Sequence, residues 1–128
     1  MAFTDISIGV DLIEVPRIQA ALSRWGERFE RRVFTEDERA YCSSRAKPYQ
    51  SYAARFAAKE AAMKALGTGW RGLDWKEIEV ARERSGRPGI VFHGRAKEIY
   101  DRLGGAVVRV SLSHTEEHAV ANVAILLR

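Results

Sequence analysis

The sequence contains few of the residues that mark secreted, membrane-bound or disulfide-stabilised proteins. It has one cysteine, Cys42, so no disulfide can form within the chain, and we expect a reduced protein of the cytoplasm. No apolar run approaches the ~20 residues that a membrane-spanning helix needs. The N-terminal stretch "MAFTDISIGV" lacks the basic and apolar regions of a signal peptide. These absences predict a protein without membrane contacts.

Motifs for several kinds of catalysis are also absent. No GxGxxG or GxxxxGK[ST] stretch occurs, no cysteine and histidine spacing suggests zinc, and no Ser-His-Asp or Cys-His arrangement suggests a nucleophile. Cys42 has no flanking motif, and His93 and His118 lie within or beside apolar strands, so we interpret all three as structural. The sequence therefore offers no nucleophile of its own.

The composition is typical of one compact globular domain. The 128 residues are 46% hydrophobic and 30% charged, and we expect a single domain over residues 1–128. The formal net charge of +4 suits an anionic partner, such as a phosphate-rich cofactor, an acidic protein or nucleic acid. We do not expect nucleic acid, because acidic residues interrupt the basic surface: Glu27, Glu30, Glu36, Asp37 and Glu38.

The hydrophobic pattern predicts an α+β fold, with one mostly antiparallel sheet packed against a long central helix. We expect strands over residues 6–13, 78–81, 90–93, 107–113 and 118–127. We expect helices after Pro16, from the capping box "TEDE" at 35–38, over 48–66, and from 95 to the glycines at 104–105. The last strand is almost entirely apolar, which predicts a central strand buried on both faces.

The predicted central helix carries charges in an otherwise apolar stretch. "RFAAKEAAMKALGTG" (55–69) combines alanines with Arg55, Lys59, Glu60 and Lys64. In one interpretation, Glu60 and Lys64 form an exposed i,i+4 pair, and the other two basic side chains reach past the apolar stripe to water. In the other, the stripe faces a cleft in which Glu60 holds a cation and the basic side chains hold phosphates. The helix alone leaves both open.

Two further segments carry polar groups at strands. Asp11 shares one face of the first predicted strand with Gly9, opposite an apolar row, and is either solvated or one of two carboxylates that hold a hard cation. At the end of the strand 107–113, Ser113, His114 and Thr115 either bind a phosphate or stabilise a turn.

The first predicted helix carries a line of arginines beside an apolar stripe. If the helix continues past Gly26, its arginines fall on one face: Arg17, Arg24, Arg28 and Arg31. Such a ridge is either a solvated surface or a docking site for an acidic helix.

Three segments together resemble one family. "IGVDLIEVPRI", "RFAAKEAAMKALGTG" and "VSLSHTEEHAVANVAI" are similar, in order and spacing, to the holo-[acyl-carrier-protein] synthases, the small bacterial type of 4′-phosphopantetheinyl transferase. The resemblance implies the 4′-phosphopantetheinyl transferase fold, typically a homotrimer with active sites between subunits. It also implies transfer of 4′-phosphopantetheine from coenzyme A to a serine of apo acyl carrier protein, with adenosine 3′,5′-bisphosphate as the other product. The pathway would be fatty acid biosynthesis.

The resemblance also implies roles for individual residues. Asp11 and Glu60 would bind Mg²⁺, and Lys64 would lie near the pyrophosphate and the attacking serine. Groups facing coenzyme A would be Arg55, Ser113, His114 and Thr115 at the phosphates, Arg45 and Lys47 at the 3′-phosphate, and Gly86, Arg87 and Pro88 near the adenine. Docking of the acidic carrier protein would fall to Arg17, Arg24 and Arg28.

Two other interpretations remain at this point. The chain could be a binding module without enzymatic activity, whose charged helix forms surface pairs and whose arginines recruit an acidic protein. It could also be a phosphopantetheinyl transferase that acts on carrier domains of large synthases. Those enzymes are usually about twice as long, as two fused copies, so the length of this chain favours the small trimeric type.

Overall fold

The computed structural model describes residues 2–128. Its elements, in chain order, are β1 (Asp5–Glu14), α1 (Val15–Trp25), α2 (Glu27–Val33), α3 (Glu36–Ser43), α4 (Pro48–Leu66), the 3₁₀ turn η1 (Trp75–Glu77), β2 (Ile78–Arg82), β3 (Pro88–Phe92), α5 (Gly94–Leu103), β4 (Gly105–His114) and β5 (His118–Leu127). The predicted α+β class is confirmed, and the predicted strands and helices are present.

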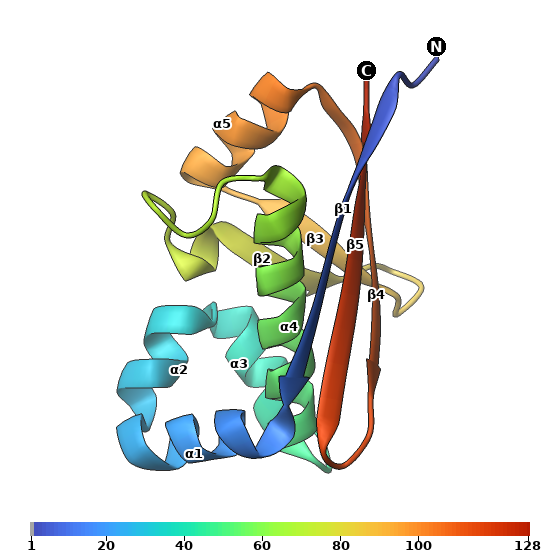
Figure 1. The fold of residues 1–128 in the computed structure, drawn as a ribbon. Helices are drawn as coiled ribbons and strands as arrows, with labels where there is room; N and C mark the ends of the chain where they lie inside the picture. The colour runs from blue at the N-terminus through green and yellow to red at the C-terminus, as the bar shows by residue number, and fades with distance from the viewer. Residues whose placement is uncertain (1) are drawn as a thin grey trace.

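The strands form two antiparallel sheets rather than the single sheet that we predicted. One sheet has the order β1-β5-β4, and the other is the hairpin β2-β3. Figure 1 shows the helices on one side of the three-stranded sheet, with α4 running along it, and the hairpin passing behind the sheet so that its turn projects past β4. The hairpin contacts the edge strand β4 without joining the hydrogen-bonded ladder of this sheet, because β3 pairs with β2.

Residues 2–128 leave the far face of the three-stranded sheet uncovered. In β1, the side chains of this face are Ile6, Ile8, Val10 and Leu12, which are 49–66% exposed. The strand β5 is central, as predicted, but only alternate residues are fully buried: Ala119, Ala121, Val123 and Ile125. The expectation that β5 is buried on both faces is therefore wrong for the single chain, because no helix covers the second face.

The helix α4 forms the centre of the molecule and has the bounds that its end signals predict. Pro48 occupies the first turn, and Gly67 ends the helix in a left-handed conformation with φ of 79°. Its alanines let it pack closely on β1. A Cβ atom built on Gly9 would lie 1.9 Å from the carbonyl oxygen of Ala61, so only glycine permits this approach. The backbone of α4 therefore occupies the space beside Gly9.

The first helix is interrupted where the sequence suggested a possible break. α1 ends at Trp25, Gly26 has φ of 55° and ψ of −131°, and α2 begins at Glu27. A non-glycine residue disfavours such a backbone, so Gly26 separates two helices that run in different directions (Figure 1). No helix of residues 2–128 has the length and apolar character needed to cross a membrane.

Candidate functional site

Two carboxylates and a lysine meet where α4 faces β1. We call this group the carboxylate–lysine cluster: Asp11, Glu60 and Lys64. The Nζ atom of Lys64 lies 3.2 Å from Oδ1 of Asp11 and 3.0 Å from the carbonyl oxygen of Val10. Burial raises the pKa of the Glu60 carboxyl, and the nearby charge of Asp11 adds to this effect. Lys64 therefore forms its ion pair with Asp11 on β1. The exposed-pair interpretation required a pair between Lys64 and Glu60 along the helix, which is not the pair observed.

The cluster has the chemistry of a hard-cation site. Carboxylate oxygens are the protein ligands that Mg²⁺ prefers, and Mg²⁺ typically needs only one or two of them, with substrate phosphates and water completing its shell. Asp11 and Glu60 are such a pair. Among residues 2–128 no group of three or more His, Cys, Asp or Glu side chains is arranged for a metal. These two residues fit a metal shared with a phosphate, and do not make a closed structural site.

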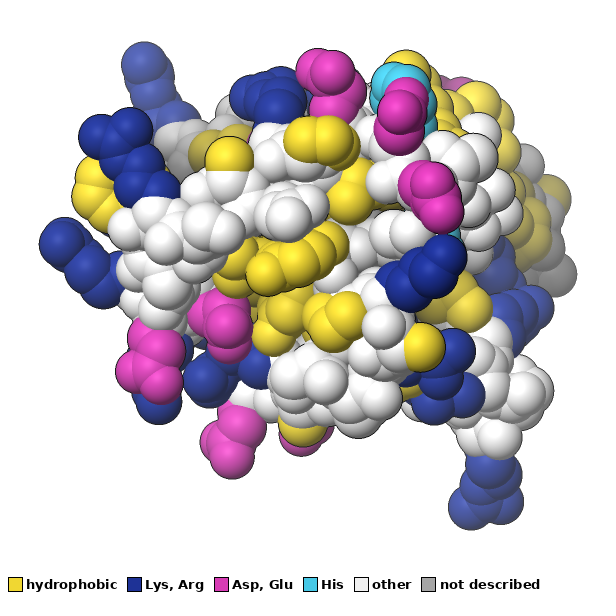
Figure 2. Space-filling model, turned by 90° about the horizontal axis from the view of Figure 1, so that it is seen from below, with side chains coloured by type: hydrophobic (Ala, Val, Ile, Leu, Met, Phe, Trp, Pro, Cys, Tyr) yellow, Lys and Arg dark blue, Asp and Glu magenta, His cyan; other side chains and the backbone are white. Residues whose placement is uncertain are grey.

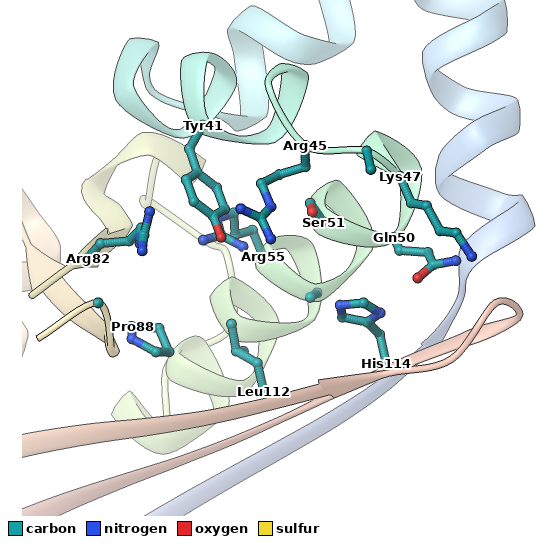
Figure 3. Close-up of a pocket in the computed structure, with 13 residues that line it drawn as sticks. Tyr41, Arg45, Lys47, Gln50, Ser51, Arg55, Arg82, Pro88, Leu112 and His114 are labelled. Carbon is teal, nitrogen blue, oxygen red and sulfur yellow. The ribbon is translucent and has the colours of Figure 1, made fainter.

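A basic cavity of about 420 Å³ lies beside the cluster, between α3, α4, the hairpin and β4 (Figure 3). Its lining comprises Tyr41, Arg45, Ala46, Lys47, Gln50, Ser51, Ala54, Arg55, Arg82, Gly86, Pro88, Leu112 and His114. No acidic side chain belongs to it. A cavity with four cationic side chains and a histidine suits a ligand with several phosphate charges.

Three arginines surround the ring of Tyr41 in this cavity. The guanidinium carbons of Arg55, Arg82 and Arg45 lie 4.1, 4.9 and 5.3 Å from the ring centroid. Arg55 is only 6% exposed, and its buried Nε atom has no hydrogen-bond partner. Guanidinium groups that stack against an aromatic ring leave their N–H donors free for an anion. We therefore interpret this part of the cavity as an anion-binding site.

Most of the residues predicted for coenzyme A line this cavity. They are Arg45, Arg55, Gly86, Pro88 and His114, together with Lys47.

Three predicted residues lie outside the cavity lining. The Nε atom of Arg87 donates to Oε1 of Glu83 at 2.9 Å, on the outside of the hairpin turn. Ser113 is exposed and, by the alternation of β4, lies on the uncovered sheet face. Thr115 accepts hydrogen bonds from the amides of Glu117 and His118, at 3.3 and 3.1 Å, which is the turn-stabilising role. Within the single chain these three residues do not join the site.

Two prominent cavity residues, Tyr41 and Arg82, were not predicted from the sequence. Neither lies in a motif, and each reaches the cavity only because α3 and the hairpin fold against α4. The one local signal for Arg82 is its place on β2 two residues after the buried Val80, on the same face of the strand.

Two charged or reactive residues prove to be structural. Lys59 is fully buried and forms an ion pair with Glu38, so it neither reaches water nor faces the cavity. Cys42 is also fully buried, and burial raises the pKa of its thiol to about 12, so the reactive thiolate is suppressed at neutral pH.

The arginine ridge does not form a single helical face. Arg17 and Arg24 are exposed on α1, whereas Arg28 and Arg31 belong to α2 beyond the break at Gly26. The alignment was predicted only for a helix that continues past Gly26, and this condition is not met. Figure 2 views the end of the molecule that carries α1, where Lys and Arg side chains, with Asp and Glu side chains among them, surround hydrophobic ones. A hollow of about 290 Å³ lies there between Trp25, Arg28, Phe29 and Arg32.

Comparison with known proteins gives a consistent result. Residues 7–123 match the sequence pattern of the 4′-phosphopantetheinyl transferase superfamily. A holo-[acyl-carrier-protein] synthase of Koribacter versatilis is 51% identical over 119 residues, which cover 92% of this chain and 95% of the relative.

Solved structures agree with the sequence matches. The ACPS-CoA complex of Chronobacterium ammoniagenes has a TM-score of 0.85 and 30% identity, and the match covers 98% of this chain and 99% of that one. The Helicobacter pylori holo-[acyl-carrier-protein] synthase in complex with coenzyme A has a TM-score of 0.79 and 28% identity, covering 92% and 98% of the two chains. The chain therefore belongs to the 4′-phosphopantetheinyl transferase superfamily, as a transferase of the holo-[acyl-carrier-protein] synthase family.

Proposed function

We propose that the protein transfers the 4′-phosphopantetheine group of coenzyme A to a serine of apo acyl carrier protein. The products are holo carrier protein and adenosine 3′,5′-bisphosphate. We further propose that the reaction depends on Mg²⁺, that it serves fatty acid biosynthesis in the cytoplasm, and that residues 1–128 act as one domain. The observation that carries the proposal is the closeness of the carboxylate–lysine cluster to the basic cavity.

The distance between the carboxylate–lysine cluster and the basic cavity follows from the register of the sheet and the rise of α4. Asp11, Ala121 and Leu112 stand opposite one another across β1, β5 and β4. Since neighbouring strands lie about 4.8 Å apart, Asp11 is roughly 10 Å from Leu112 in the cavity lining. Along α4, Glu60 lies about 7.5 Å beyond Arg55. A ligand with phosphates at both places, such as coenzyme A, matches this spacing.

The residues of the chain have distinct parts in the proposed reaction. Asp11 and Glu60 would hold the Mg²⁺, which supplies positive charge at the diphosphate when it is bound. Lys64 adds a second positive charge near the phosphate that is attacked. The basic cavity holds the adenosine 3′,5′-bisphosphate end and fixes its position. Phosphoryl transfer needs positioning and charge neutralisation more than covalent help, and the carrier protein supplies the serine nucleophile.

Incubation of the protein with coenzyme A, Mg²⁺ and an apo acyl carrier protein tests the proposal directly. We expect the carrier protein to gain the mass of one phosphopantetheine group, measured by mass spectrometry of the intact protein. The alternative of a binding module without activity predicts no gain in mass, even where the two proteins form a complex. An unchanged carrier mass at long incubation would reject the transferase function.

We propose that Arg17, Arg24 and Arg28 contact the acidic carrier protein. All three are exposed at the end of the molecule that carries α1. Opposite charges across such a surface steer encounter and fix orientation.

We expect Arg17→Glu to raise the KM for carrier protein by about tenfold or more, since a close charge pair at an interface contributes over 1 kcal/mol. The KM for coenzyme A should stay near the wild-type value. Steady-state kinetics with each substrate varied in turn measures both. The matched control is Arg102→Glu at the exposed end of α5, which should change neither constant. Equal effects of Arg17→Glu on the two constants would contradict the docking role.

We also propose a homotrimer with active sites between subunits. The uncovered sheet face supports the proposal, because a row of four large apolar side chains exposed on one strand is unusual for a monomer. A neighbouring subunit on this face would also bring protein close to Ser113, which the single chain leaves exposed.

A further inference from the structure

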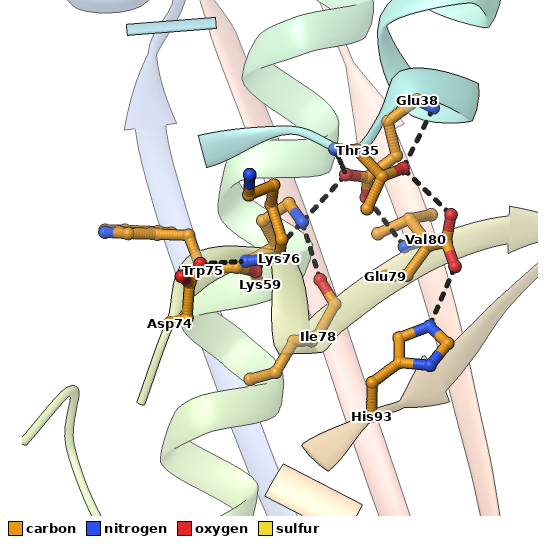
Figure 4. Close-up of polar contacts among 10 residues, drawn as sticks. All are labelled: Thr35, Glu38, Lys59, Asp74, Trp75, Lys76, Ile78, Glu79, Val80 and His93. Atoms are coloured by element: carbon orange, nitrogen blue, oxygen red, sulfur yellow. Dashed lines mark hydrogen bonds and ion pairs between the residues drawn. The ribbon is translucent and has the colours of Figure 1, made fainter. Parts of the chain in front are cut away.

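A buried ion pair joins α3 to α4 behind the basic cavity. Oε1 of Glu38 lies 2.8 Å from Nζ of Lys59, and both side chains are completely buried (Figure 4). Lys59 also donates to the carbonyl oxygens of Ile78 and Trp75, at 2.6 and 3.2 Å. Burial lowers the pKa of the Lys59 ammonium, and the Glu38 carboxylate works against this effect. The carboxylate of Glu38 and the two carbonyl oxygens together use all three N–H donors of the Lys59 ammonium.

Glu38 extends the same network to β2 and to the start of α3. Its Oε1 atom accepts from the amide of Thr35 at 2.7 Å, and its Oε2 atom accepts from the amide of Val80 at 2.8 Å. The hydroxyl of Thr35 accepts from the amide of Glu38 and donates to Glu79 at 2.8 Å. We call Thr35, Glu38 and Lys59 the buried network. It ties three separate segments of the chain, α3, α4 and the β2 region, to one another.

Each of these segments carries a cavity residue next to its network residue. Tyr41 lies three residues after Glu38 on α3, and Arg55 lies four residues before Lys59 on α4. Residues at these spacings occupy the same side of a helix, one turn apart. The distance between the two helices at the ion pair therefore also determines how Arg55 meets the ring of Tyr41.

The same relation holds on β2. Arg82 follows Val80 by two residues and shares its face of the strand. The hydrogen bond from the amide of Val80 to Glu38 thus fixes the position of β2, and with it that of Arg82, relative to α3. Arg82 reaches the Tyr41 ring from the side of the hairpin. The arginine group around Tyr41 is assembled from three segments that the buried network holds together.

Stability alone is a poor reason for such a pair. Removing two charges from water carries a large desolvation cost, and well-packed apolar side chains of similar volume often stabilise a fold as much or more. What a saturated network supplies is a defined geometry. That geometry matters where guanidinium groups must be held close together despite their mutual repulsion.

We propose that the Glu38–Lys59 pair is a positioning element for the basic cavity, which sets Arg55 and Arg82 against Tyr41 and so determines the affinity for the adenosine 3′,5′-bisphosphate part of the substrate. The inference rests on the proposed function. Neither Glu38 nor Lys59 belongs to the cavity lining, so neither touches the substrate and both act through other residues.

The test is the Glu38→Gln variant, which keeps the shape of the side chain and removes its charge. We expect the KM for coenzyme A to rise about tenfold, because a buried hydrogen bond to a charged group contributes on this order. The kcat and the KM for carrier protein should change by less than about twofold. Titration calorimetry with adenosine 3′,5′-bisphosphate should show the same loss of affinity, without carrier protein.

A matched control separates positioning from stability. Ile125→Val removes one methylene from a fully buried position on β5, away from the cavity lining, and should lower the unfolding temperature without altering the KM for coenzyme A. If Glu38→Gln instead lowers kcat and leaves both KM values unchanged, the pair is only structural and the inference is overturned.

A second variant covers the case in which Glu38→Gln does not fold. Thr35→Val keeps the ion pair and removes the hydroxyl that links α3 to Glu79, so a smaller rise in the same KM is expected. An unchanged KM for coenzyme A in Thr35→Val would then overturn the inference. Transfer by the unaltered protein tests the proposed function, and the ratio of KM values tests the network, so the two can fail separately.

Discussion

We expect the Glu60→Gln variant to lose phosphopantetheinyl transfer by about a thousandfold or more, since a metal site contributes several kcal/mol of transition-state stabilisation. Glutamine keeps the shape of the side chain but lacks the negative charge that would hold Mg²⁺. Asp11→Asn should have the same effect, because the two carboxylates belong to one cluster. The measurement is the rate of holo carrier protein formation at saturating coenzyme A and increasing Mg²⁺.

The fold should survive this loss of activity. Folding raises the pKa of the Glu60 carboxyl. At pH values between its ordinary pKa and its raised pKa, the folded protein therefore binds more protons than the unfolded protein. The free energy of unfolding therefore falls as the pH rises through that window, and the ionised Glu60 destabilises the folded protein above it. A glutamine carries no such charge. We expect Glu60→Gln to unfold at the same or a higher temperature than the wild type at pH 8 without magnesium.

The control for both measurements is Glu98→Gln on the exposed side of α5, which removes an equal charge away from the cluster. It should transfer at the wild-type rate and unfold at the wild-type temperature. Transfer by Glu60→Gln or Asp11→Asn with normal magnesium dependence would show that these residues are not the metal ligands.

The second large effect is expected from Ile8→Glu on the uncovered sheet face. Ile8 is 62% exposed in the single chain, so the substitution removes little packing from the fold of the subunit. In the proposed trimer the same position would be buried against a neighbour, and an unpaired carboxylate there costs several kcal/mol. We expect a folded monomer with little or no transfer activity, because the proposed active sites lie between subunits.

Light scattering coupled to size-exclusion chromatography measures this effect as a change of mass, and circular dichroism reports the fold. The matched control is Leu103→Glu at the end of α5, another large apolar residue that is 40% exposed but lies outside the sheet. The control should keep the mass and activity of the wild type. An Ile8→Glu protein with wild-type mass and activity would exclude this sheet face as a subunit interface.

Features that depend on neighbours in sequence could be predicted well. The bounds of α4 follow from Pro48 and Gly67, and the start of α3 follows from the capping box of Thr35 and Glu38, in which both reciprocal hydrogen bonds are present. These signals work because a helix end needs partners for its own free backbone groups, and those partners lie within a few residues.

The partners of the charges on α4 could not be predicted in this way. The sequence left open whether Lys59 reaches water or a phosphate, and it does neither, because its ion pair is with Glu38, 21 positions earlier in the chain. Lys64 was expected to pair with Glu60 along the helix or to serve a cleft, and it pairs with Asp11 on β1. When the possible partners of a side chain lie far away in the sequence, the neighbouring residues do not indicate which partner it will contact.

The sequence by itself determined the strands and helices, the nearly all-apolar character of the central strand and the family resemblance, all of which are properties of short segments. Only the tertiary structure decided which face of β1 is covered. The face with Gly9 and Asp11 packs on α4, and the more apolar face with Ile8 stays exposed. The physical reason is the close approach of an alanine-rich helix, which requires a glycine opposite its backbone. That contact places Asp11 beside Glu60 and Lys64, and so assembles the site from segments about fifty residues apart.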